Sequence, residues 1–279
     1  MRRWLRRFGP RLQEQLNVVA GVVGVAAFAL ALAGVLAGGT ARTLLVVAGA
    51  SVAGVMVIVG IARAWPPKEL KPSDVAGKDL PLADLPSIYP RVPALGILGS
   101  GAVGKTTLKK RLLQMPTREK EATQRVTFHV SPLLHDHTRY IALLDGRGES
   151  YDQQFEIAAQ AEIVLVLIDH NDIETTGPNP DRLTSHHDFG IQIRDYLKRH
   201  ETSKRAVHLL LNKKDLWQNA DSDDQERIRG FFSNEVDLWR AALGDGVSSA
   251  EHSNNVPNDT AHLIEAINTR WTELQQQGL

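Results

Sequence analysis

The chain contains no cysteine among its 279 residues. Disulfide bonds and thiolate metal sites are therefore excluded, while the cellular compartment stays open on this criterion. An excess of basic charge is also missing, because from residue 72 onward 23 Lys and Arg face 30 Asp and Glu, a net charge of −7. Nucleic-acid binding requires a basic surface, so we expect no nucleic-acid partner.

Charged residues are nearly absent from the early part of the chain, after a basic start. Residues 1–15 hold five Arg, and the stretches 15–41 and 43–62 carry no charge. About 20 apolar residues cross the hydrocarbon core as a helix. We therefore predict a basic cytoplasmic N-terminus over 1–15 and a transmembrane helical hairpin over 16–63, with a cleaved signal peptide as the alternative for the first run.

The basic flanks predict the orientation of this hairpin. Three cations, Arg63, Lys68 and Lys71, follow the second run, whereas the turn between the runs carries only Arg42. By the positive-inside rule both ends lie in the cytoplasm. The expected location is thus a membrane, the bacterial inner membrane, with the lipid bilayer as a partner and the rest of the chain cytoplasmic.

Proline is concentrated in the next stretch, with seven of the 13 Pro in residues 66–93. Because proline lacks an amide donor and fixes φ, this stretch should be extended. We predict a proline-rich linker over 64–90; the alternative is that part of it packs along the surface of the following domain.

A glycine-rich turn, GSGAVGKT, occupies residues 99–106 between an apolar run and a helical pattern. It fits the phosphate-binding pattern G-x-x-x-x-G-K-[ST] in the required order of strand, turn and helix. Glycines let backbone amides converge on phosphate, Lys105 would reach the β- and γ-phosphates, and Thr106 would bind Mg²⁺. The predicted cofactor-binding residues here are Gly99, Ser100, Gly101, Ala102, Val103, Gly104, Lys105, Thr106 and Thr107.

Two further motifs end apolar runs. The first is Asn212-Lys213-Lys214-Asp215, in which the Asp215 carboxylate can accept the two adjacent donors of guanine, a pair that adenine lacks. Asn212 would connect this segment to the glycine turn, and Lys213 would lie along the base. The second is the D-x-x-G sequence from Asp145 to Gly148, in which Asp145 would contact Mg²⁺ and the Gly148 amide the γ-phosphate.

With these three motifs in order, residues 91–279 resemble the Ras-like small GTPases. The resemblance implies an α/β P-loop NTPase fold, a G domain over 91–279 with a mostly parallel six-stranded sheet and helices on both faces. It also implies a switch threonine that binds Mg²⁺, for which Thr123 fits better than Thr117 or Thr127.

The resemblance leaves two points open. A Ser-Ala-type loop near the base corresponds to Ser253-Asn254 or to Ser249-Ala250, with the first favoured by the register of the last helix. Glu149 stands where the family usually has Gln, which orients the attacking water. The residues assigned to catalysis are Lys105, Thr123, Gly148 and Glu149, and those assigned to metal are Thr106, Thr123 and Asp145.

Some polar groups receive no function at this stage. The paired histidines 186 and 187 have no second ligand pair, so no zinc site is expected. The run IVLVLIDH, ending in Asp169 and His170, resembles a Walker B strand, but D-x-x-G already supplies the Mg²⁺ role.

The sequence therefore predicts a membrane-anchored GTPase that binds GTP or GDP with Mg²⁺. Hydrolysis should be slow or dependent on a partner, and residues 116–125 and 146–156 should switch to recruit a cytoplasmic effector or activating protein. The plan is similar to the membrane-tethered β subunit of the signal-recognition-particle receptor. The alternative is a hydrolysis-poor scaffold that stays loaded with GTP.

Overall fold

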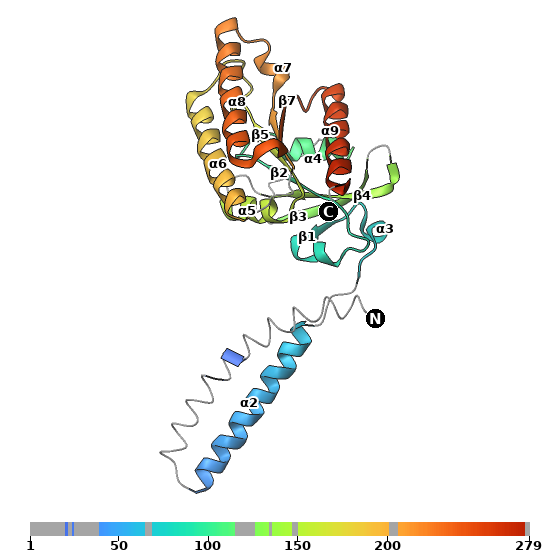
Figure 1. The fold of residues 1–279 in the computed structure, drawn as a ribbon, viewed down its shortest axis with the longest axis vertical. Coiled ribbons are helices and arrows are strands. Elements are labelled where there is room, and N and C mark those ends of the chain that lie inside the picture. Colours follow the sequence, from blue (N-terminus) through green and yellow to red (C-terminus); the bar gives the residue numbers. More distant parts are fainter. Residues whose placement is uncertain are drawn as a thin grey trace. The chain divides into compact units, whose positions relative to one another are not determined.

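The structure is a computed structural model, and it divides the chain into two compact units, 1–69 and 70–279. It describes residues 20, 21, 24, 39–64, 69–114, 126–133, 136–146, 150–200 and 206–276. Figure 1 shows the elements of both units in sequence colours.

The first unit contains helix α2, Thr40–Ala64. Several of its apolar side chains are exposed, Val52 and Ile58 among them. A membrane-crossing helix needs about 20 continuous apolar residues. Within the part of the chain that the structure describes, no helix is long and apolar enough to cross a membrane. The prediction of a multi-pass membrane location is therefore wrong, and the hairpin is not found; most of its first run, 16–37, lies outside the described residues.

The second unit is built on a seven-stranded sheet with the order β1-β3-β4-β2-β5-β6-β7. The strands β2, β4, β5, β6 and β7 run parallel, whereas β3 pairs antiparallel with β4, and β1 with β3. Their bounds are β1 Asp79–Pro81, β2 Ala94–Leu98, β3 Thr127–Leu133, β4 Asp136–Asp145, β5 Ile163–Ile168, β6 Ala206–Leu211 and β7 Val247–Glu251.

The sheet has one strand more than the six expected, because the proline-rich stretch supplies β1. Asp79 and Pro81 pair with residues of β3 at the sheet edge. A proline is tolerated there, since an edge strand leaves one row of backbone groups outside the ladder. Leu70 bridges Ile88, and Val75 and Leu82 are buried, so residues 70–90 lie within the second compact unit.

Helices cover both faces of the sheet, as expected. Figure 1 shows α5, α6 and α8 on one side and α4 and α9 on the other. The bounds are α3 Pro72–Val75, η1 Leu82–Ser87, α4 Lys105–Leu112, α5 Tyr151–Gln160, α6 Pro180–Arg199, α7 Lys214–Trp217, α8 Ser222–Leu243, η2 Gly244–Gly246 and α9 Pro257–Gln276.

The two apolar layers follow the alternation of side chains along each strand. In β2, Ala94 and Leu98 pack with α5, α6 and α8, whereas Leu95 and Ile97 pack with α4 and α9. A strand buried on both faces reads as a continuous apolar run, which is why β2, β5 and β6 were visible in the sequence.

Candidate nucleotide-binding site

The glycine turn joins the end of β2 to the first residue of α4 and requires its glycines. The φ angles are +146° at Gly99 and +97° at Gly104, in the left-handed region that disfavours side chains. A Cβ at Gly99 would lie 2.8 Å from the carbonyl oxygen of Leu167. A Cβ at Gly104 would lie 2.7 Å from the side-chain nitrogens of both Asn212 and Asn254.

Lys105 lies at the start of α4 with only 7% of its surface exposed. Its Nζ donates to the carbonyl oxygens of Gly99 and Ser100, each at 2.7 Å. The cation therefore spans the loop that precedes it. An ammonium with three donors in this position can also serve a phosphate oxygen.

The segment Asn212–Asp215 follows β6 and is connected to the glycine turn. Asn212 is buried, and its Nδ2 donates to the carbonyl oxygen of Val103 at 2.8 Å. Lys213 has a φ of +58°, and its Nζ lies 2.7 Å from Asp169 Oδ2. The Lys213 ammonium thus reaches the end of β5, a contact that the sequence did not reveal.

Asp215 is held by two neighbours on the loop after β7. Its Oδ1 accepts a hydrogen bond from Ser253 Oγ at 2.6 Å, and its Oδ2 accepts one from Asn255 Nδ2 at 3.0 Å. Partial burial raises the pKa of Asp215, but these hydrogen bonds outweigh it and hold the pKa below its ordinary value. The carboxylate is therefore ionised and fixed in orientation at neutral pH.

The structure separates the two candidates for the Ser-Ala-type loop. Ser249 and Ala250 lie within β7 and pair with β6. Ser253 contacts Asp215, and Asn254 Nδ2 donates to the carbonyl oxygen of Gly104 at 3.1 Å. Of the two pairs, Ser253-Asn254 is the one in contact with the other predicted site residues.

Asp145 is the last residue of β4 and is 1% exposed. Lys109 Nζ lies 3.8 Å from its Oδ2, and Thr106 and Thr107 occupy the first turn of α4. Carboxylate and hydroxyl oxygens suit Mg²⁺, which one or two carboxylates and the phosphates of a nucleotide usually hold. In the described part of the chain no three His, Asp or Glu side chains gather as a metal site.

The remaining predicted residues, Thr123, Gly148 and Glu149, lie outside the described residues. Three further residues, Asp169, Arg182 and His186, lie beside the glycine turn. Sequence reasoning gave Asp169 and His186 no function and did not name Arg182. The signal for Asp169 was present, because it directly follows the apolar run of β5. Arg182 had no local signal, and the histidine pair that contains His186 indicated no contact with the glycine turn.

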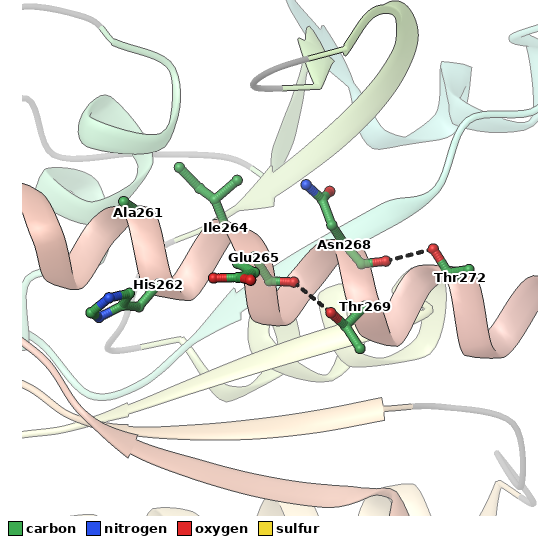
Figure 2. A pocket seen from close by; sticks show the side chains of 7 residues that line it. All are labelled: Ala261, His262, Ile264, Glu265, Asn268, Thr269 and Thr272. Carbon is green, nitrogen blue, oxygen red and sulfur yellow. Dashed lines mark hydrogen bonds between the residues drawn. The ribbon is translucent and has the colours of Figure 1, made fainter.

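A pocket elsewhere on the domain does not compete with this site. It lies along one face of α9, where Figure 2 shows Glu265, Asn268, Thr269 and Thr272 in successive turns. The hydroxyls of Thr269 and Thr272 donate to the backbone carbonyls of Glu265 and Asn268 within the same helix. They serve the helix itself and do not converge on a common point.

No family model matches the chain, and no curated protein matches it. One similar solved structure is translation elongation factor SelB from Methanococcus maripaludis in complex with the GTP analogue GPPNHP. It is 19% identical with a TM-score of 0.44, and the match covers 65% of this chain and 34% of the SelB chain. Two substitution variants of SsGBP are 18% identical, with TM-scores of 0.46 and 0.45; each covers 67% of this chain, and the chain covers 57% and 58% of them. The chain therefore spans between a third and three fifths of the length of these three structures.

Proposed function

We propose that this protein binds guanine nucleotide together with Mg²⁺ and hydrolyses GTP slowly, as a switch that recruits a protein partner. One observation carries the proposal: an ionised, oriented carboxylate, Asp215, stands in a segment that hydrogen bonds the glycine turn through Asn212. Base recognition and phosphate binding would thus be parts of one connected site.

The choice of guanine follows from hydrogen-bond chemistry. Guanine presents N1–H and the N2 amino group side by side, and an ionised carboxylate accepts both. Adenine presents no such pair, so its binding would leave the Asp215 charge desolvated and unpaired. The contacts from Ser253 and Asn255 support the proposal because they use one position on each oxygen and leave lone pairs for the base.

The phosphates would lie in the glycine turn, against the backbone amides and Lys105 Nζ. Mg²⁺ would be held by the Thr106 hydroxyl, by Asp145 (directly or through water) and by Thr123. When bound, Mg²⁺ would neutralise charge on the β- and γ-phosphates. The half-buried Thr106 hydroxyl and the buried Asp145 carboxylate are oxygen donors that fit such an ion.

Slow hydrolysis is proposed because Glu149 replaces the water-orienting Gln, and a carboxylate beside a triphosphate is repelled. The same residue favours a second candidate, a scaffold that stays loaded with GTP. Single-turnover hydrolysis by the full chain and by Glu149→Gln separates the two. GTP in the purified protein, with a rate equal to that of free GTP, would favour the scaffold.

Titration of the full chain with mant-GDP and mant-ADP in Mg²⁺ tests the base assignment. We expect GDP to bind at least 100-fold more tightly than ADP, and Asp215→Asn to weaken GDP binding about 10- to 100-fold, because hydrogen bonds to a charged group are lost. Asp237→Asn, at a 72% exposed side chain on α8, is the control. Equal binding of the two nucleotides by the wild-type chain would exclude the proposed function.

A further inference from the structure

A buried polar cluster lies beside the glycine turn and contains none of the motif residues of the phosphate site. Its centre is Asp169, which follows β5 and is completely buried. Asp169 Oδ1 accepts from Arg182 Nε at 2.6 Å and lies 2.6 Å from His186 Nε2. Its Oδ2 lies 2.7 Å from Lys213 Nζ. Two cations and an imidazole, from α6 and from the segment after β6, therefore meet on one carboxylate.

The cluster contacts the glycine turn at two consecutive residues. Arg182 Nη2 donates to the carbonyl oxygen of Gly101 at 2.7 Å. His186 Nδ1 lies 3.4 Å from Ser100 Oγ. His186 Nε2 has two neighbours, Asp169 Oδ1 at 2.6 Å and the Asp169 backbone N–H at 3.2 Å. The acceptor-only carboxylate is the nearer of the two, so we assign the proton to Nε2, which leaves Nδ1 to accept from the Ser100 hydroxyl. Burial lowers the pKa of His186, which agrees with a neutral imidazole.

Arg182 contacts a backbone carbonyl of the turn and none of its amides. In a phosphate-binding turn the amide N–H groups converge on the anion, so the carbonyl groups face away from it. A guanidinium bound to the Gly101 carbonyl therefore fixes the orientation of the adjoining peptide planes without touching phosphate. Arg182 is itself fixed, because Asp169 accepts from its Nε and its side chain is only 10% exposed.

We infer that Arg182, held by Asp169, is a positioning residue that orients the glycine turn for phosphate binding, and that Asp169 joins this turn to the base-binding segment through Lys213. The inference rests on the proposed function and deepens it. It assigns the first turn of α6, which belongs to none of the three motifs, to the nucleotide site.

The test compares ligands with and without phosphate on the full chain. We expect Arg182→Gln to weaken GDP binding about tenfold, the effect of one charged hydrogen bond, and to change guanosine binding less than twofold. Arg182→Lys should recover part of the loss, because an ammonium can still donate to the Gly101 carbonyl. Arg199→Gln, at the exposed far end of the same helix, should bind both ligands as the wild type does.

A general loss of structure would give a different result. It would weaken guanosine and GDP equally and lower the melting temperature, and either equal weakening or unchanged GDP binding would overturn the inference. Should Arg182→Gln fail to fold, His186→Gln and Arg182→Lys, which keep a donor toward Asp169, supply the same comparison. Absence of GDP binding by the wild-type chain would instead remove the proposed function, and the inference with it.

Discussion

Gly104 offers a direct test of the connection between the glycine turn and the two asparagine-bearing loops. Its φ is +97°, and an added Cβ would lie 2.7 Å from Asn212 Nδ2 and 2.7 Å from Asn254 Nδ2. Both nitrogens donate to carbonyl oxygens of the turn, at Val103 and at Gly104 itself. A methyl group at this position must therefore displace two amides that hold the turn.

The expected cost of Gly104→Ala has two parts. A side chain in the left-handed region costs about 1–2 kcal/mol. Each displaced hydrogen bond costs a further 1 kcal/mol, approximately, because the buried partners lose their contact. We therefore expect the free energy of unfolding to fall by about 3–4 kcal/mol, and the affinity for GDP to fall at least tenfold.

Two other glycines separate these parts. Gly244 has φ +75° and ψ −152°, a region that essentially only glycine adopts, with nothing within 4 Å of its added Cβ, so Gly244→Ala should cost only a backbone term, about 1–3 kcal/mol. Gly230 lies in α8 with open space around it, so Gly230→Ala should stabilise the protein by about 0.5–1 kcal/mol. Urea unfolding monitored by circular dichroism measures all three. A cost for Gly104→Ala no larger than that for Gly244→Ala would refute the proposed contact with both amides.

Three further changes have expected outcomes. Burial lowers the pKa of His208 to about 4, so the folded state binds fewer protons than the unfolded state between about pH 6.5 and 4. The free energy of unfolding should therefore fall by about 3 kcal/mol as the pH drops through this window. In urea titrations, His208→Gln should remove this part of the pH dependence of stability. Asp221 caps α8 by accepting from the Asp224 amide at 2.8 Å, so Asp221→Ala should lower the free energy of unfolding, measured by urea titration, by about 1 kcal/mol. Asn255→Ala should weaken GDP binding about three- to tenfold in mant-GDP titrations, because Asp215 loses one orienting donor; unchanged affinity would contradict that role.

The parts of the fold that depend on local patterns could be predicted from the sequence. The apolar runs of β2, β5 and β6 are buried on both faces, so each appears as an unbroken stretch. The glycine turn could be predicted because its backbone needs positive φ angles at Gly99 and Gly104, which glycine adopts most readily.

Other parts depend on contacts that no local pattern records. The strand β1 is three residues long and ends in Pro81, so its sequence reads as a linker; pairing with β3 alone makes it a strand. For the early apolar runs, by contrast, the sequence predicted a structure that is not found. Low charge over some 20 residues was taken as sufficient for a membrane span, whereas no described helix meets the requirement of length and apolar character together.

The positioning cluster follows from topology and for that reason could not be read from the sequence. The parallel strands β2, β5 and β6 end at the same edge of the sheet, where each continues into a loop. Asp169 directly follows β5, and α6, the next helix along the chain, begins at this same edge. Arg182 in the first turn of α6 therefore meets Gly101, although 81 positions separate them. The edge that gathers the ligand-binding loops also gathers the residues able to hold those loops in place, and these need no motif because their partners are backbone carbonyls and one buried carboxylate. Nucleotide affinity in this chain should therefore be sensitive to changes in α6 that leave every recognisable motif intact.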